Sequence, residues 1–360
     1  MAKTMFDYIN SSTELIEENL KKRIALTETM VNEYIKGPYH NITIVASGSS
    51  NNAAQCARLY MEKVLKCKVT VISPFEFIHA EHSVASDEMV IAVSQSGYSV
   101  NTMEALKFIN DKLNRKAIVL TGDLNSDIVS VADMAVDFGV GEETVGYVTK
   151  GVIALSLYLM LFALEAAKMC KIIGRNEYDT WVREFEKVSG AHEKMIVATK
   201  KFYADNIKAL TSLQTVYICS VGANMGTAME GALKVGETIQ VPGIAYELEE
   251  YIHGPNLQLS PKHNVFIIDA QDETSDRSYQ IYRASRAVSD RVYYITNKAY
   301  DDDHVLTLLN PCEDTVSLTY LQVFQLFAYR ISKELRSIPK HPLFEEFKKI
   351  VNSKTITYED

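Results

Sequence analysis

Residues 90–102 read VIAVSQSGYSVNT, and the rest of the chain is organised around this pattern. The apolar, mostly β-branched run 90–93 predicts a buried strand. A polar turn from Ser94 to Ser99 follows, and apolar residues then recur at helical spacing at Met103, Leu106 and Ile109. The stretch therefore predicts a strand, a hydroxyl-rich turn and a helix in direct succession.

The turn 94–99 is a candidate anion site. It places serine hydroxyls and the Gln95 amide beside the free backbone N–H groups of a helix N-terminus, where the helix dipole favours negative charge. A dianionic phosphate is the ligand that such a turn suits. The turn contains no Lys or Arg, so we expect neutral donors to hold the phosphate. The alternative is that Ser and Gly serve only as turn and N-cap residues.

Strand-like and helical segments alternate on both sides of this stretch. Such alternation predicts a parallel sheet with helices on both faces. Ligands of these sheets bind beyond the carboxyl ends of the strands, where the tight turn Ser47–Ser50 and the turn Ser94–Ser99 fall. A helix is predicted from about residue 52 to 65, and one or two amphipathic helices over 6–36. The predicted strands lie at 41–46, 68–73, 90–94, 117–121 and 134–138.

The pattern restarts near residue 215, which indicates an internal duplication. Superposing Gly48 on Gly222 shifts the sequence by 174 positions, and the same shift brings 76–79 (EFIH) onto 250–253 (EYIH). The halves are not equivalent, because Asp269 and Asp272 stand where the first half has its serine turn. Carboxylates repel phosphate, so we expect one phosphate site for the two halves.

Composition excludes several classes of function. The 360 residues carry a net charge of −9, which argues against a nucleic-acid or anionic-membrane surface. The N-terminus lacks the apolar core of a signal peptide. Five cysteines without a CxxC pair fit reduced thiols in a cytoplasmic protein. The apolar run 152–164 is shorter than a bilayer crossing, so we expect a helix buried in the core or at a subunit interface. No Walker, zinc or dinucleotide motif is present, so we expect no metal and no cofactor.

Four further positions could carry chemistry. Glu237 shares a predicted helix face with Glu230 and Lys234, so it belongs either to a solvated salt-bridge stripe or to a catalytic site. His253, before Gly-Pro, is either structural or solvated, or suited to acid/base catalysis. By default Lys354 is a surface lysine, and Glu143 is an acid at a helix start that the helix dipole stabilises.

Six motifs together resemble the tandem sugar-isomerase (SIS) domains of the isomerase half of glucosamine-6-phosphate synthase, over residues 35–360. The resemblance implies two flavodoxin-like SIS domains that bind a sugar 6-phosphate. The motifs, in order, are Ala46-Ser-Gly-Ser-Ser50, Ser94-Gln-Ser-Gly, Glu143-x6-Lys150, Glu230-Gly-Ala-Leu-Lys-x2-Glu237, Glu250-x2-His253-Gly-Pro and the terminal Lys354.

The resemblance also implies roles for individual residues. Glu237 would move protons between C1 and C2 of the sugar, and His253 would open the sugar ring in a neighbouring subunit's site. Lys354 would lie near the carbonyl, and Glu143 is placed with the substrate-binding residues. Ser47 and Ser49 would contact the sugar. The phosphate would be held by Ser50, Ser94, Gln95, Ser96 and Ser99.

The chain departs from the synthase in two places. It begins with Met1-Ala2, and we expect no glutaminase domain with an N-terminal cysteine nucleophile. The synthase's terminal pattern is replaced here by 344–354 (FEEFKKIVNSK). This layout is more similar to bacterial deglycases that split 6-phosphorylated Amadori compounds, such as fructoselysine 6-phosphate and glucoselysine 6-phosphate.

The prediction is therefore a cytoplasmic deglycase/isomerase that forms a homodimer or homotetramer and requires no nucleic acid or membrane. The alternatives are an aminosugar-phosphate aminotransferase-type isomerase or deaminase without a glutaminase domain, and a non-catalytic sugar-phosphate sensor. A sensor needs neither Glu237 nor His253. The predicted layout is N-terminal helices at 1–36, SIS domain 1 at 37–170, connecting helices at 171–210, SIS domain 2 at 211–335 and a C-terminal tail at 336–360 that closes the active site.

Overall fold

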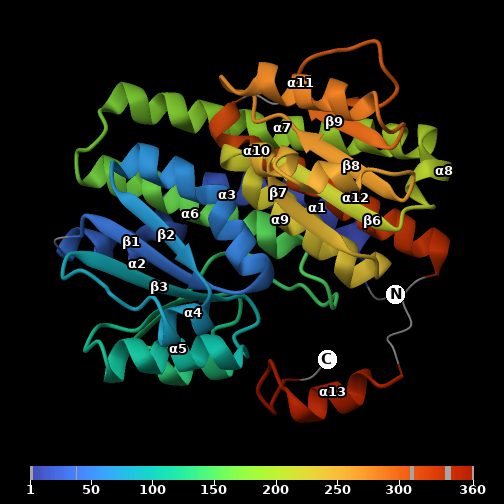
Figure 1. The fold of residues 1–360 in the computed structure, drawn as a ribbon. Coiled ribbons are helices and arrows are strands. Elements are labelled where there is room, and N and C mark those ends of the chain that lie inside the picture. The colour runs from blue at the N-terminus through green and yellow to red at the C-terminus, as the bar shows by residue number, and fades with distance from the viewer. Residues whose placement is uncertain (1–2, 38, 309–311, 337–341, 359–360) are drawn as a thin grey trace. The chain divides into compact units, whose positions relative to one another are not determined.

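The computed structural model of the protein describes residues 3–37, 39–308, 312–336 and 342–358 (Figure 1). The chain forms two compact units. The first-sheet unit comprises Leu15–Val182 and Pro339–Asp360, and the second-sheet unit comprises Met1–Glu14 and Arg183–Ile338. Each unit contains one five-stranded parallel sheet flanked by helices, so the predicted α/β class is confirmed.

The first sheet has the strand order β2-β1-β3-β4-β5, and all neighbouring strands are parallel. This is the flavodoxin-like order, in which ligands bind at the switch point between β1 and β3. Because β1 and β3 are neighbours, the segments that follow them start at the same edge of the sheet. The strands are β1 (Asn41–Ala46), β2 (Lys68–Ile72), β3 (Glu88–Ser94), β4 (Ile118–Thr121) and β5 (Met134–Asp137).

Helices cover both faces of the first sheet, with α3 and α6 on one side and α5 on the other (Figure 1). Apolar side chains of α4 and α5 pack with those of β3 in one buried cluster. The helices α1 (Met5–Lys21) and α7 (Arg175–Asp205) contribute residues to both units. The other helices of this unit are α2 (Arg23–Lys36), α3 (Gly48–Leu65), α4 (Pro74–His79), α5 (Val100–Asp111), the 3₁₀ helix η1 (Asp127–Val131), α6 (Lys150–Met169) and α13 (Phe344–Ile350).

The apolar helix α6 is longer than its sequence run indicates. It spans 20 residues and has the length and hydropathy of a membrane-crossing helix, so the expectation that it is too short is wrong. However, 89% of its apolar window is buried. It packs on α2 and α3, and the Ser156 hydroxyl donates to the Ala53 carbonyl of α3 (3.1 Å). Helix α6 is therefore a core helix of this unit.

The second sheet has the order β10-β9-β8-β6-β7, again all parallel. Helix α12 packs against α9, and its Phe324 and Phe327 join Phe266 of β8 in a buried cluster. The strands are β6 (Thr215–Ser220), β7 (Gly243–Glu247), β8 (His263–Ile268), β9 (Val292–Thr296) and β10 (Val305–Thr307). The helices are α8 (Ile207–Leu210), η2 (Gly222–Asn224), α9 (Met225–Lys234), the π-helix η3 (Val235–Ile239), α10 (Leu248–Ile252), η4 (Pro255–Gln258), α11 (Ser275–Arg286), η5 (Glu313–Thr315) and α12 (Val316–Leu335).

The two sheets repeat one topology, with β6, β7, β8, β9 and β10 in the places of β1, β2, β3, β4 and β5. The shift of 174 positions carries β1 onto β6 over its whole length and the start of α4 at Pro74 onto the start of α10 at Leu248. The internal duplication inferred from the sequence is thus present in the fold. Its second copy keeps the sheet and replaces the serine turn.

A buried histidine makes the stability of the second-sheet unit sensitive to acid. His192 of α7 is fully buried, with its Nδ1 atom 2.9 Å from Thr13 Oγ1 of the same unit. Burial lowers the pKa of His192 to about 4, against about 6.5 for an exposed histidine. The unfolded chain therefore binds a proton that the folded chain does not, and stability is lost as the pH falls from about 6.5 to about 4.

We expect His192→Gln to abolish about 3 kcal/mol of this acid-induced loss of stability. The measurement is urea denaturation of both proteins at several pH values between 7 and 4. The free energy of unfolding of the wild type should fall more steeply with acid than that of the variant. Parallel curves for the two proteins would show that His192 is not the group responsible.

Candidate functional site

The turn Ser94–Ser99 connects the carboxyl end of β3 to the N-terminus of α5. Its conformation depends on Gly97, whose φ of +74° is the left-handed region that favours glycine. A Cβ atom on Gly97 would lie 1.7 Å from Ser126 Oγ. The Gly97 N–H donates to Ser94 Oγ (3.2 Å), and its carbonyl accepts from the Ile128 N–H (2.9 Å). These contacts hold the turn against η1 in one defined shape.

The segment Ser47–Ser50 follows β1, the strand that lies next to β3 in the sheet. The prediction of a tight turn before the helix is wrong, because Gly48 to Ser50 already form the first turn of α3. Ser49 is buried, and Ser47 and Ser50 are half-buried. The serines therefore lie at a helix N-terminus, which is the environment that the phosphate hypothesis requires.

Asn101 joins the two serine segments. Its Nδ2 donates to Ser47 Oγ (3.0 Å), and its Oδ1 accepts from Ser99 Oγ (3.0 Å). The N-termini of α3 and α5, of 18 and 12 residues, thus adjoin at the edge where β1 and β3 end. Both helix dipoles favour an anion there. Sequence reasoning missed Asn101, although a polar residue in the first turn after Ser99 is a detectable signal.

Glu143 lies in the loop before α6, and its carboxylate contacts both the N-terminus of α6 and the serine turn. Its carboxylate accepts from the backbone N–H groups of Thr149 (3.0 Å), Lys150 (2.6 Å) and Gly151 (3.0 Å), and from Gln95 Nε2 (2.7 Å). The structure thus places Glu143 as the helix-start acid and joins it to Gln95. Direct contact of Glu143 with a substrate stays a prediction.

The C-terminal segment brings an ammonium to the turn. Lys354 Nζ donates to Ser96 Oγ (2.5 Å), across 258 positions of sequence. The expectation that neutral donors hold the phosphate stays a prediction, and this ammonium lies beside those donors. Periodicity could not have placed Lys354 there, because the contact depends on the path of the tail.

In the second-sheet unit, Glu230 and Lys234 are buried, with 1% and 0% of their surfaces exposed, so the interpretation as a solvated stripe is wrong. Lys234 Nζ lies 3.3 Å from Glu230 Oε1 and 2.5 Å from Glu237 Oε2. Burial by itself would lower the pKa of Lys234, but the two carboxylates outweigh burial and raise it. Lys234 therefore remains charged and orients Glu237, whose side chain is 34% exposed.

Glu237 and His253 flank strand β7. Glu237 lies in the π-helix η3 before the strand, and His253 follows α10 after the strand and is exposed. Glu247 caps α10 by accepting from the N–H groups of Glu249 (2.8 Å) and Glu250 (3.0 Å). In the described part of the chain, the ion pairs of Glu237 are with Lys234 and none is with His253. The catalytic roles of both residues stay predictions.

The second sheet has a buried carboxylate in place of the serine turn. Asp269 directly follows β8 and is fully buried. It accepts from Ser275 Oγ (2.7 Å), Thr296 Oγ1 (2.7 Å) and the Gln271 N–H (2.9 Å). The carboxylate thus holds the loop between β8 and α11 in place. The hydroxyl groups of Ser275 and Thr296 donate to this carboxylate.

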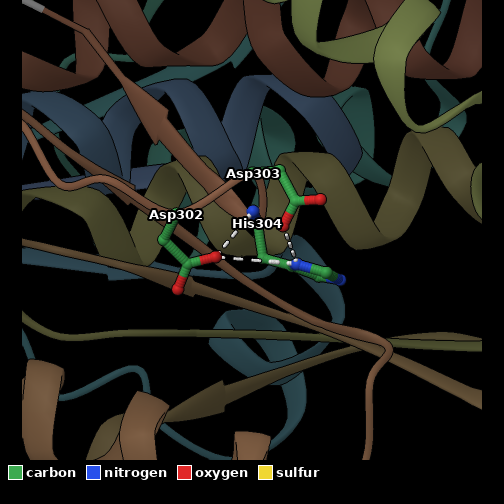
Figure 2. Close-up of side chains that lie close together, drawn as sticks. All are labelled: Asp302, Asp303 and His304. Atoms are coloured by element: carbon green, nitrogen blue, oxygen red, sulfur yellow. Dashed lines mark hydrogen bonds and ion pairs between the residues drawn. The ribbon is translucent and has the colours of Figure 1, made fainter.

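A second group of ionisable side chains lies before β10 (Figure 2). Ligand-type atoms of Asp302, Asp303 and His304 lie within 4.8 Å of one another. Neighbouring groups already bind these atoms: Asp302 accepts from Tyr282 Oη (2.6 Å) and the His304 N–H (2.9 Å), and Asp303 lies 2.7 Å from His304 Nδ1. We interpret the group as a structural one, which holds the loop before β10 in its conformation.

The first-sheet unit combines a flavodoxin-like sheet with two serine-rich helix starts at its switch point. Residues 38–165 match the SIS domain family. Over about four fifths of its length, the chain is homologous to part of glutamine–fructose-6-phosphate aminotransferase, its isomerase half.

Individual relatives agree with this assignment. The glutamine–fructose-6-phosphate aminotransferase [isomerizing] of Cyanidium caldarium is 26% identical over 303 residues, which cover 80% of this chain and 48% of that protein. The chain thus spans about half the length of the curated relatives it matches.

Solved structures share the complete fold. One protein from Clostridium difficile 630, described provisionally as a phosphosugar isomerase, superposes with a TM-score of 0.87 at 25% identity, covering 99% of this chain and 100% of the other. The C-terminal domain of glucosamine-fructose-6-phosphate aminotransferase from Francisella tularensis gives a TM-score of 0.84 at 20% identity, covering 95% and 99%.

Proposed function

We propose that this protein is a phosphosugar isomerase-type enzyme that acts as a deglycase on 6-phosphorylated Amadori compounds of the fructoselysine or glucoselysine type. The observation that carries the phosphate part is the joined pair of helix N-termini at Ser47–Ser50 and Ser94–Ser99. Homology to a sugar-phosphate isomerase half supports the reaction class.

The reaction needs one carboxylate, one ring-opening group and a phosphate anchor. In the open-chain substrate, C1 carries the amine and C2 is a carbonyl. Glu237 removes a proton from C1 while O2 gains one, which forms an enolamine. Return of the proton to C2 gives a protonated imine between C1 and the amine nitrogen, because the nitrogen keeps its own hydrogen. Water hydrolyses this imine to the C1 aldehyde and the free amine, and the product is a hexose 6-phosphate.

Two other residues of the second-sheet unit assist the reaction in this proposal. Lys234 keeps the Glu237 carboxylate in place through their ion pair. His253 opens the sugar ring, and we propose that it does so in the site of a second copy within a homodimer or homotetramer. Two observations support the sharing of His253 between copies. His253 is exposed, and it follows β7 in the chain whereas Glu237 precedes that strand. We further propose that the enzyme acts in the cytoplasm and needs no metal or cofactor.

An aminosugar-phosphate isomerase or deaminase is the second candidate, and similarity to aminotransferases named for fructose 6-phosphate favours it. A coupled assay for glucose 6-phosphate separates the two. We expect release from 6-phosphorylated fructoselysine or glucoselysine without free ammonia. Release of ammonia from glucosamine 6-phosphate would instead support the second candidate. If none of these substrates gives a product, the result would indicate a sugar-phosphate sensor.

A further inference from the structure

The C-terminal segment 353–358, which we call the strap, is bound along the serine turn. Its backbone forms an antiparallel bridge between Lys354 and Ser99. The Val100 N–H donates to the Ser353 carbonyl (3.2 Å), and the Thr355 N–H donates to the Tyr98 carbonyl (2.9 Å). These bonds fix the strap in register with the turn, as strand pairing does.

Side chains secure the strap further along. The Thr357 hydroxyl donates to Asp127 of η1, and this bond lowers the pKa of Asp127. The rings of Tyr358 and Tyr98 have centroids 5.4 Å apart. The position of Lys354 is therefore set by groups on both sides of it, and its ammonium is aimed at Ser96 by the backbone register.

The contact also fixes the direction of the Ser96 hydroxyl. A serine oxygen has two acceptor positions and one proton to donate. Ser96 Oγ accepts from Lys354 Nζ (2.5 Å) and from the Tyr98 N–H (3.4 Å). Its own proton is then left to donate outward, as an anion requires, and the ammonium polarises that O–H bond.

We propose that Lys354 is the counter-charge of the bound phosphate and that the strap forms part of the phosphate site. The inference rests on the proposed function only in taking Ser94–Ser99 as the phosphate anchor. The turn itself has no Lys or Arg, so Lys354 brings a positive charge to the turn that precedes α5. The reacting carbons lie at the other end of a hexose 6-phosphate, so an ammonium on Ser96 serves binding and not carbonyl chemistry. The ligand is a phosphate monoester dianion.

The test is isothermal titration with fructose 6-phosphate. We expect Lys354→Met to weaken binding about 10- to 100-fold, the range for a lost charge-assisted hydrogen bond. Lys354→Arg should stay within about threefold. The matched control is Lys349→Met on α13, which removes one charge from the same tail where Lys349 pairs with Glu346 (2.7 Å), and it should bind as the wild type does.

A second variant protects the test against misfolding of the strap. Ser96→Ala should weaken binding and make the further loss from Lys354→Met smaller than in the wild-type background, since both act through one contact. If Lys354→Met binds as tightly as the wild type but turns over more slowly, the inference is overturned. The role near the substrate carbonyl would then be the better assignment for Lys354. Failure of the wild type to bind fructose 6-phosphate would instead overturn the proposed phosphate site itself.

Discussion

Glu237→Gln is expected to lower kcat for the deglycase reaction by about 10²- to 10⁴-fold, the range for loss of a general acid/base. The amide keeps the size of the side chain but cannot take the C1 proton. Binding of fructose 6-phosphate should change little, because the proposed phosphate anchor lies elsewhere in the chain. His253→Ala should reduce kcat by a similar factor if ring opening limits turnover. Steady-state kinetics of glucose 6-phosphate release measure both effects.

The control for this experiment is Glu273→Gln, which neutralises an exposed carboxylate of the same unit and should leave kcat unchanged. Turnover by Glu237→Gln or His253→Ala within about tenfold of wild type would contradict the assigned mechanism. Mixing the two inactive variants adds a test of sharing between copies. If His253 serves a neighbouring site, mixed oligomers should regain part of the activity, whereas a site within one copy predicts no recovery.

Lys234→Met is expected to lower the free energy of unfolding by about 3–5 kcal/mol, the cost of removing one partner from a buried ion pair. The substitution takes the ammonium away from Glu230, whose surface is 1% exposed, and from Glu237. Because the ammonium also orients Glu237, kcat should fall as well. Urea denaturation at pH 7 measures the stability change.

A double variant provides the control for this prediction. Glu230→Gln combined with Lys234→Met removes the buried carboxylate together with the ammonium, so stability should recover part of the loss seen in Lys234→Met. A loss below about 1 kcal/mol in the single variant would show that water reaches the pair and that the burial of Lys234 does not govern its energetics.

Local patterns in the sequence predict most of the elements. The β-branched run at 41–46 is β1, and the shift of 174 positions, which carries this run onto β6, predicts the repeated topology. The helix predicted from about residue 52 to 65 is α3, which begins four residues earlier and ends at the same residue. These predictions succeed because the period of apolar residues reports which face of an element is buried, and that information is local.

The candidate site is only partly local. A strand followed by serines and a helix places Ser94–Ser99 and Ser47–Ser50 beyond the ends of two strands, and the strand order brings them to one edge. The bridging role of Asn101 and the first turn of α3 at Gly48–Ser50 are details of hydrogen bonding that composition does not specify. Glu143 matches its default as a helix-start acid, while its bond to Gln95 depends on how α6 approaches the turn.

By itself the sequence determined the class of fold, the duplication and the difference between a serine turn and the Asp269 turn. The tertiary structure decided which charged side chains are buried and which of them contact other groups. Helical spacing puts Glu230, Lys234 and Glu237 on one face, but only packing against the unit shows that Lys234 is buried and Glu237 is not. Likewise, Lys354 reaches Ser96 because the tail pairs with residues 98–100. Burial and contacts between distant positions follow from how whole elements pack, and a period in the sequence carries no record of that.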